Sequence, residues 1–301
     1  MPQNISMNRR LALLFAAALL APAQAQEGRS SGPLARKYQE DEPIAYDIRA
    51  THRGRAAESQ YTAKVRGLVR RDAAGIFHEE LAWGDLQADG QPIPLPAEAE
   101  RFRQRVSLDP RAPLRVPRLA EIHPALAGPV FDLVNFYGDL KLAARTPGLA
   151  KPGDKVRIPH NRANSWADGR NVLVGEDALD FEISLDAIEA GKATITVRHV
   201  PPENPAINLS AEWMNERVVP SAANNWTQLG RYPQGKYTAA VGVETIEVKL
   251  VVDTGSGRIV SGTLTNPVEI VERECEDLEA RRCGEPVRRS LMRRIELTAK
   301  P

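Results

Sequence analysis

The stretch that decides the fold is TIEVKLVVD, residues 245–253. Apolar residues stand at positions 246, 248, 250 and 252, and polar residues stand at 245, 247 and 249. A period of two places the apolar side chains on one face of a β-strand and the polar ones on the other. Such strands belong to antiparallel sheets with one wet face, whereas parallel strands of α/β folds are apolar on both faces. This stretch therefore favours a mainly β fold.

The same alternation recurs along the chain. It predicts strands near 44–48, 61–70, 102–108, 179–185, 194–198 and 291–297. Turn-forming residues such as Asp89-Gly90 separate several of these segments. Residues 26–43 are polar at first and carry no such pattern, so we expect a flexible lead-in there. A single β-rich domain then covers 44–301.

One segment breaks the period of two. Apolar residues recur at helical spacing at 130, 133, 134, 137 and 140, with Pro129 at the first helical position and Pro147-Gly148 as the stop. We expect an amphipathic helix, which Gly138 could interrupt because glycine costs about 1 kcal/mol in a helix interior. Two interpretations stay open. The helix covers an open face or end of the sheet, or it is a lid over an apolar cavity.

The first 25 residues have the pattern of a signal peptide. Arg9 and Arg10 precede an apolar run over 11–21, and Ala23-Gln24-Ala25 supplies a small-x-small cleavage site. A membrane-spanning helix needs about 20 apolar residues, which makes a permanent anchor the weaker alternative. We expect cleavage near Ala25, a mature protein in the periplasm or secreted beyond it, and no transmembrane segment after cleavage.

Composition and cysteine content narrow the class of protein. The 301 residues carry 40 Lys+Arg against 39 Asp+Glu and are 42% hydrophobic, which argues against a nucleic-acid binder and against a disordered chain. Cys275 and Cys283 stand eight residues apart in a polar stretch. In an oxidising compartment they predict a structural disulfide, which would contribute about 2.5 kcal/mol. The alternative is a redox pair, although such pairs usually take the form Cys-x-x-Cys.

Catalytic motifs are weak. The sequence VVDTGS around Asp253 is similar to the aspartic protease motif, but that mechanism needs two carboxylates in contact and the motif occurs once. Asp253 also falls in register with the polar face of its strand, where a hairpin turn is the simpler explanation. The five histidines, at 52, 78, 123, 160 and 199, lack metal-ligand spacing. We predict no catalytic residue, metal or cofactor, and leave open whether the protein is an enzyme.

Six aromatic residues are candidates for contact with an apolar ligand. Phe131, Phe136 and Tyr137 lie on the predicted helix, and Trp166, Trp213 and Trp226 lie in stretches without a strand pattern. The alternative is that these rings plug the ends of the fold. Arginines also gather at 101, 103, 105, 111, 115 and 118. They either protect an edge strand from aggregation or bind an anionic lipid or polymer.

Two short motifs accompany the order of elements: the loop Lys151-Pro152-Gly153-Asp154 and the turn Thr254-Gly255-Ser256-Gly257-Arg258. With this order, residues 44–270 resemble exported bacterial proteins of the DUF3108 type. They are more distantly similar to half-barrel lipoprotein carriers of the LolA type. The resemblance implies a large curved antiparallel sheet, a half-barrel or open barrel, with a concave apolar face and an extracytoplasmic role. It supplies no catalytic residues. Segment 206–229 and the cysteine loop have no counterpart in it.

Three functions follow as hypotheses. The first is a periplasmic binding or carrier module that holds a lipid or other apolar ligand on the concave face. The second is an interaction or structural protein of the cell envelope, with a filled core, no ligand cavity and an envelope protein as its partner. The third is a hydrolase with an aspartic-type site at Asp253.

Overall fold

The computed structural model describes residues 32–54, 57–118, 121–159, 166–167, 171–176, 180–200, 213, 224–231 and 235–301. The predicted signal peptide, the first part of the predicted lead-in and most of segment 206–229 lie outside these residues.

Strands dominate the described part of the chain. The first half contains β1 (Pro43–Gly54), β2 (Glu58–Arg71), β3 (Phe77–Ala88), β4 (Gln91–Pro92), α2 (Ala97–Arg101), β5 (Arg103–Val106), the 3₁₀ turn η2 (Pro124–Leu126), α3 (Ala127–Arg145) and β6 (Lys155–Pro159). The second half contains β7 (Trp166–Ala167), β8 (Asn171–Glu176), β9 (Asp180–Glu189), β10 (Lys192–Val200), β11 (Asn224–Arg231), β12 (Tyr237–Glu244), β13 (Glu247–Asp253), β14 (Ile259–Cys275) and β15 (Val287–Ala299).

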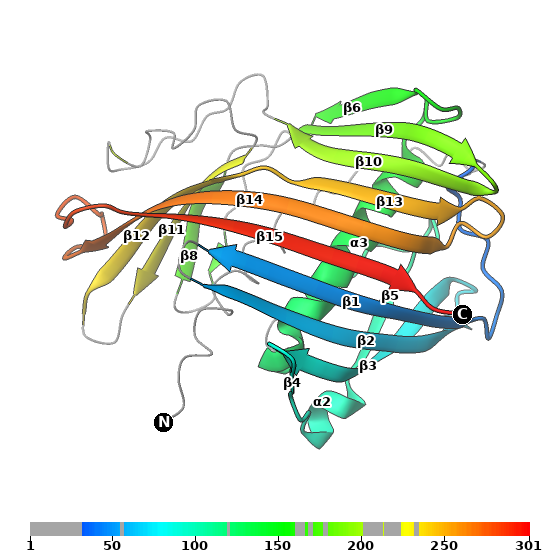
Figure 1. Ribbon diagram of the computed structural model, residues 1–301, viewed down its shortest axis with the longest axis horizontal. Coiled ribbons are helices and arrows are strands. Elements are labelled where there is room, and N and C mark those ends of the chain that lie inside the picture. The colour runs from blue at the N-terminus through cyan, green and yellow to red at the C-terminus, as the bar shows by residue number, and fades with distance from the viewer. Residues whose placement is uncertain are drawn as a thin grey trace.

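Within the described residues, the strands join in one antiparallel sheet that forks at its longest strand. β14 pairs with β15 along one side, and along the other it pairs first with β13 and then with β12. One branch continues through β10, β9 and β6, and the other through β11, β8 and β7. The sheet is curved and does not close into a barrel (Figure 1). The predicted fold class, mainly β with a large curved antiparallel sheet that forms a half-barrel or open barrel, is confirmed.

The stretch at 245–253 behaves as its alternation predicts. Its residues 247–253 form β13, and Val248, Leu250 and Val252 are each at most 1% exposed. Leu250 lies between Ile195 of β10 and Gly262 of β14 in the ladder. Both neighbouring strands also place a small or apolar residue on the inner face here. One face of β13 therefore packs in the core, and the other lies at the polar outer surface.

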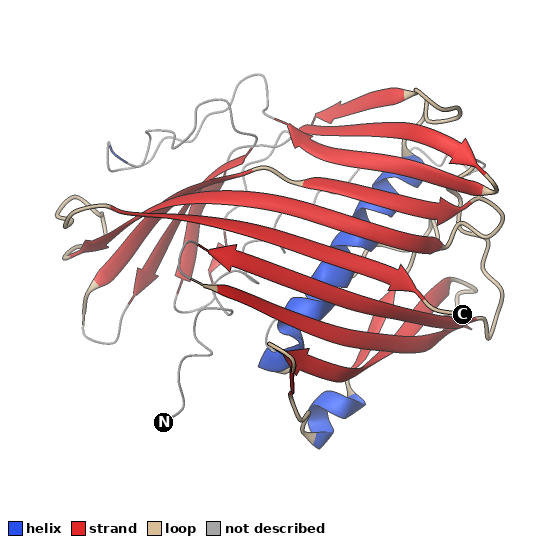
Figure 2. Ribbon diagram, in the orientation of Figure 1, coloured by secondary structure: helices blue, strands red, loops and turns tan. Residues whose placement is uncertain are grey.

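Helix α3 lies across the concave face of the sheet, behind β1, β2, β14 and β15 in the view of Figure 2. It runs from Ala127 to Arg145, so the interruption that Gly138 would have allowed does not occur. The expected amphipathic pattern is wrong in one respect: 15 of its 19 residues are buried, including Asp132, Asp139 and Lys141. The surrounding structure covers the polar side as well. Among the described residues, no helix has the length and apolar character needed to cross a membrane.

The residues just before β1 form an ordered strap, Gly32–Glu42, where the sequence predicts part of a flexible lead-in. Leu34 is 2% exposed and belongs to the main core. The backbone N–H of Lys37 donates to the carbonyl of Ser256 at 2.7 Å. A Cβ at Gly257 would lie 2.2 Å from the carbonyl oxygen of Ala35, so the strap can pass this close only because position 257 is glycine.

Candidate functional site

The three helix aromatics that were predicted to contact a ligand lie together in the protein core. Phe131, Phe136 and Tyr137 are at most 3% exposed. A Cβ at Gly262 of β14 would lie 2.8 Å from two ring carbons of Phe136 and 2.9 Å from Leu250. The ring of Phe136 therefore fills the space that an ordinary side chain at 262 would take. At these positions, the concave face is occupied by the protein's own side chains.

Of the three tryptophans, Trp226 belongs to the same main core cluster as the helix aromatics. Trp166 and Trp226 lie in strands, β7 and β11, although their stretches of sequence carry no strand pattern. Trp226 is 3% exposed and lies over Gly242, whose missing side chain makes room for the indole. Gly242 is the sequence feature that could have indicated a large buried side chain on the neighbouring strand. Trp213 belongs to a separate small apolar cluster, and the side chain of Trp166 lies outside the described residues.

A buried ion pair ties α3 to the middle of the sheet. The guanidinium of Arg293 on β15 donates to the carboxylate of Asp132 on α3, and the Tyr61 hydroxyl donates to the other oxygen of that carboxylate. Both ionic side chains are at most 4% exposed. Burial lowers the pKa of Arg293 to about 10, which leaves it charged at neutral pH. Burial and the charge of Arg293 lower the pKa of His52 to about 4, so that imidazole is neutral.

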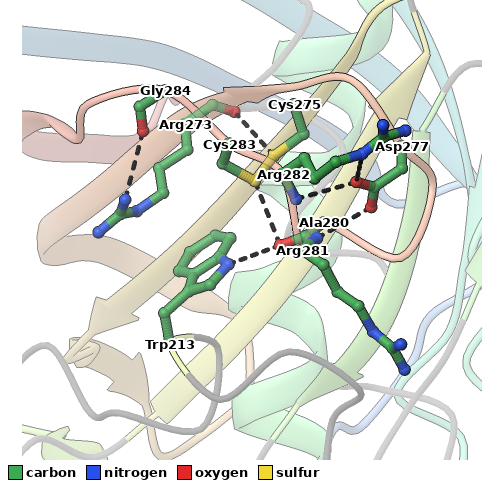
Figure 3. Close-up of a disulfide and its surroundings, with 9 residues drawn as sticks. All are labelled: Trp213, Arg273, Cys275, Asp277, Ala280, Arg281, Arg282, Cys283 and Gly284. Carbon is green, nitrogen blue, oxygen red and sulfur yellow. Dashed lines mark hydrogen bonds and ion pairs between the residues drawn. A yellow bond between two sulfur atoms is a disulfide. The ribbon is translucent and has the colours of Figure 1, made fainter.

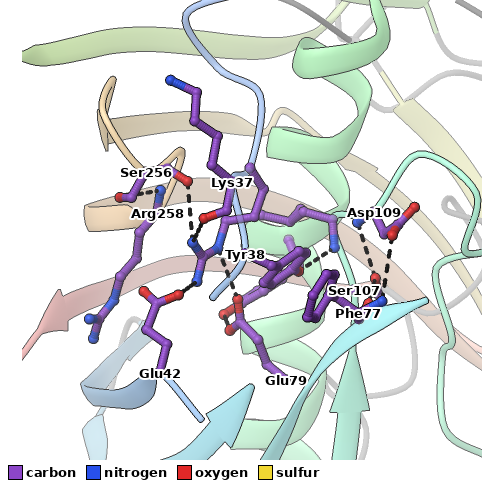
Figure 4. Close-up of polar contacts among 12 residues, drawn as sticks. Lys37, Tyr38, Glu42, Phe77, Glu79, Ser107, Asp109, Ser256 and Arg258 are labelled. Carbon is purple, nitrogen blue, oxygen red and sulfur yellow. Dashed lines mark hydrogen bonds and ion pairs between the residues drawn. The ribbon is translucent and has the colours of Figure 1, made fainter. Parts of the chain in front are cut away.

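A second buried polar cluster ties together the strap, β3 and α3 (Figure 4). Arg36 of the strap, 1% exposed at its side chain, contacts Glu42 at 2.6 Å and Glu79 at 3.4 Å. The Tyr137 hydroxyl donates to Glu79. Burial raises the pKa of Glu79, against the charge of Arg36, and raises the pKa of Tyr46 nearby to about 12. The cluster fixes the helix and the strap at the same end of the sheet.

Sequence reasoning missed both buried clusters. The alternation of these strands could have revealed both clusters. Arg293 occupies the same inward-facing set of positions as Ile295 and Leu297, and Glu79 occupies the same inward-facing set as Leu81. A charged residue at a position where the alternation expects an inward-facing apolar residue indicates a buried partner of opposite charge, because an unpaired buried charge is costly.

Asp253 has a structural role in the turn between β13 and β14. Its carboxylate accepts hydrogen bonds from the hydroxyl and the backbone N–H of Ser256, both at 2.7 Å. These bonds lower the pKa of Asp253 and favour its ionised form. Within the described residues, no group of three or more His, Cys, Asp or Glu side chains could hold a metal ion.

A shallow groove of about 690 Å³ opens on the outer face of the sheet, over β15, β1, β2 and β3. Its charges are mixed: Lys300 contacts Asp47 at 2.9 Å, and Lys64 contacts Asp85 at 2.9 Å. Arg49 lies in the ladders opposite Thr62 and Glu296 and makes no ion pair with another described residue. The balance of charge gives the groove no preference for a ligand of one sign.

Arg103 and Arg105 of the arginine-rich segment lie on β5, which pairs with β3 alone among the described strands. Both arginines are exposed, whereas Gln104 and Val106 between and after them are buried. This placement favours the interpretation of an edge strand protected by charge.

The predicted disulfide between Cys275 and Cys283 is present, with an S–S distance of 2.01 Å, at the tip of the β14–β15 hairpin (Figure 3). Asp277 accepts hydrogen bonds from the backbone N–H groups of Arg281 and Arg282, each at 2.9 Å. The Trp213 indole donates to the carbonyl of Ala280 at 2.8 Å. The loop is therefore held by one covalent and several polar links.

No protein-family model matches the sequence, and no curated protein matches it significantly. The resemblance to DUF3108-type proteins and to LolA-type carriers stays a prediction.

Proposed function

We propose that the protein is a non-catalytic interaction protein of the bacterial cell envelope, exported by its N-terminal leader and folded around a filled core. The observation that carries this proposal is the position of α3. The helix occupies the concave face where a carrier would hold its ligand, and it is buried on nearly all sides.

The polar links of α3 strengthen this interpretation. A ligand on the concave face would have to displace the helix and separate Asp132 from Arg293. Breaking a buried ion pair typically costs about 3–5 kcal/mol, because it leaves an uncompensated charge. The hydrogen bond between Tyr137 and Glu79 would be lost as well. This cost favours a partner on the outside of the molecule over an apolar ligand inside it.

Export is supported by the leader-like residues 1–25 and by the disulfide, which is typical of an oxidising compartment. The Asp253 carboxylate accepts hydrogen bonds within its own turn, and among the described residues it makes no contact with the second carboxylate that an aspartic site needs.

The test is native mass spectrometry of the protein purified gently from its own periplasm, together with cross-linking in intact cells. We expect a mass that fits the chain without its leader and with one disulfide, no lipid adduct, and a cross-linked envelope protein. A reproducible lipid mass would favour the carrier hypothesis instead. Activity against envelope polymers that Asp253→Asn abolishes would favour the hydrolase.

A further inference from the structure

The hairpin formed by β14 and β15 carries an unusual share of the exposed apolar surface. Four large hydrophobic residues of the described chain are strongly exposed, and three of them lie on this hairpin. They are Leu278, Val287 and Met292, at 55%, 52% and 41% exposure. Val287 and Met292 lie five positions apart on β15 and therefore on opposite faces of the strand, so each face carries one exposed apolar side chain.

The same hairpin has an open strand edge. β15 pairs with β14 from Val287 onward, but its ladder with β1 begins only at Leu291, opposite Gly54. On that side, residues 287–290 have no strand partner among the described residues, and all four are exposed. Within the described part of the chain, the backbone N–H and C=O groups that point to this edge therefore have no partner strand, and they can pair with an added one.

The charge at the edge selects the kind of partner. Arg288 and Arg289 are consecutive, so their side chains point to opposite faces of β15. Arg288 makes no ion pair with another described residue, and Arg289 only approaches Glu272, at 3.7 Å. Antiparallel pairing with a second copy, centred on either arginine, would place Arg288 opposite Arg288 or Arg289 opposite Arg289, and directly opposed like charges are destabilising. A strand with two adjacent carboxylates would instead meet both arginines, one on each face.

We propose that the edge of β15 at residues 287–290 binds an extended acidic segment of another envelope protein by strand addition. The inference rests on the proposed function, since it names the surface and the chemistry of the partner. Val287 provides an apolar contact at one end of the edge, and Met292 provides another just past its other end, where β15 pairs with β1. The disulfide between Cys275 and Cys283 ties the hairpin tip just beyond the ladder.

The direct test measures binding of a dye-labelled, N-acetylated peptide, Thr-Val-Glu-Glu-Val-Thr, by fluorescence polarisation. The same peptide with Lys-Lys in place of Glu-Glu is the ligand control. We expect the native protein to prefer the acidic peptide, with binding that weakens as salt rises. The double variant Arg288→Glu/Arg289→Glu should lose at least tenfold in affinity for the acidic peptide and gain preference for the Lys-Lys peptide.

The matched control is Arg49→Glu/Arg66→Glu, which makes the same charge change on exposed positions of the inner strands β1 and β2. It should leave peptide binding unchanged, and circular dichroism melting should show that both double variants are folded. Equal binding by the native protein and the edge variant would overturn the inference. So would absence of peptide binding combined with self-association of the edge variant, because the arginines would then only guard the edge.

The two proposals fail in different ways. If cross-linking captures an envelope protein equally well with Arg288→Glu/Arg289→Glu, the edge inference is wrong and the interaction function stands. If the purified protein carries lipid and cross-links to no protein, the proposed function itself fails.

Discussion

The contact between Phe136 and Gly262 offers a sharp test of where α3 lies. A methyl group at position 262 would stand 2.8 Å from two carbons of the Phe136 ring and 2.9 Å from Leu250. Favourable carbon contacts lie at about 3.5–4.0 Å, so Gly262→Ala overpacks the core at three points. Phe136 is fully buried.

We expect Gly262→Ala to lower the free energy of unfolding by about 1–2 kcal/mol. This value combines an overpacking cost of about 1–3 kcal/mol with a gain of about 0.4–1 kcal/mol from the stiffer unfolded chain. Phe136→Leu should cost about 1–2 kcal/mol on its own, less than the 3–5 kcal/mol typical of truncation to alanine. The double variant should be less destabilised than the sum, by about 1–2 kcal/mol, because leucine makes room for the new methyl group.

The assay is urea unfolding followed by tryptophan fluorescence, with the four proteins of the cycle measured together. Gly84→Ala is the matched control, because a Cβ there meets no atom within 4 Å. It should be neutral or slightly stabilising. If the losses in unfolding free energy caused by Gly262→Ala and Phe136→Leu add within about 0.5 kcal/mol, the two sites do not touch, and the helix does not pack on β14 as described.

Three further predictions concern buried charge and the disulfide. Arg293→Met should cost about 3–5 kcal/mol in thermal unfolding, because it leaves the Asp132 carboxylate buried without its cation, and adding Asp132→Leu should recover most of the loss. Asp139→Asn should raise the melting temperature at pH 8 and make no difference at pH 4. Burial raises the folded-state pKa of Asp139 to about 8, so the folded chain holds an extra proton between these values and loses stability as pH rises. A pH-independent effect of this variant would contradict that reasoning. Cys275→Ser/Cys283→Ser should lower stability by about 2.5 kcal/mol, and a reducing agent should then no longer change the melting temperature.

The sequence predicts the sheet well because alternation is a local property. In β13, the alternating apolar positions 248, 250 and 252 are buried in the structure. The helix was also found, since its start and stop signals are local. What alternation cannot show is the fork at β14, because the choice between β12 and β13 as neighbour depends on pairing between distant residues.

The candidate site was less predictable, for the same physical reason. Trp226 lies in a strand because Gly242 on the next strand admits its ring, and nothing near Trp226 in sequence shows that. Asp132 looks like a solvent-facing helix residue until Arg293, 161 positions later, is brought beside it. The order of the strap could not be predicted either. Only two of its side chains, Leu34 and Arg36, anchor it, and two residues are too few to produce a periodic hydrophobic pattern.

The most direct test of the filled core is hydrogen–deuterium exchange of the α3 backbone at neutral pH. The account predicts that the amides of residues 130–143 exchange only when the whole domain unfolds, with protection equal to the global stability, typically about 5–15 kcal/mol. Exchange of this segment at a much lower opening free energy, while β1, β14 and β15 stay protected, would contradict it. That result would mean that α3 leaves the concave face as a lid does, and that the space beneath it is open to a ligand.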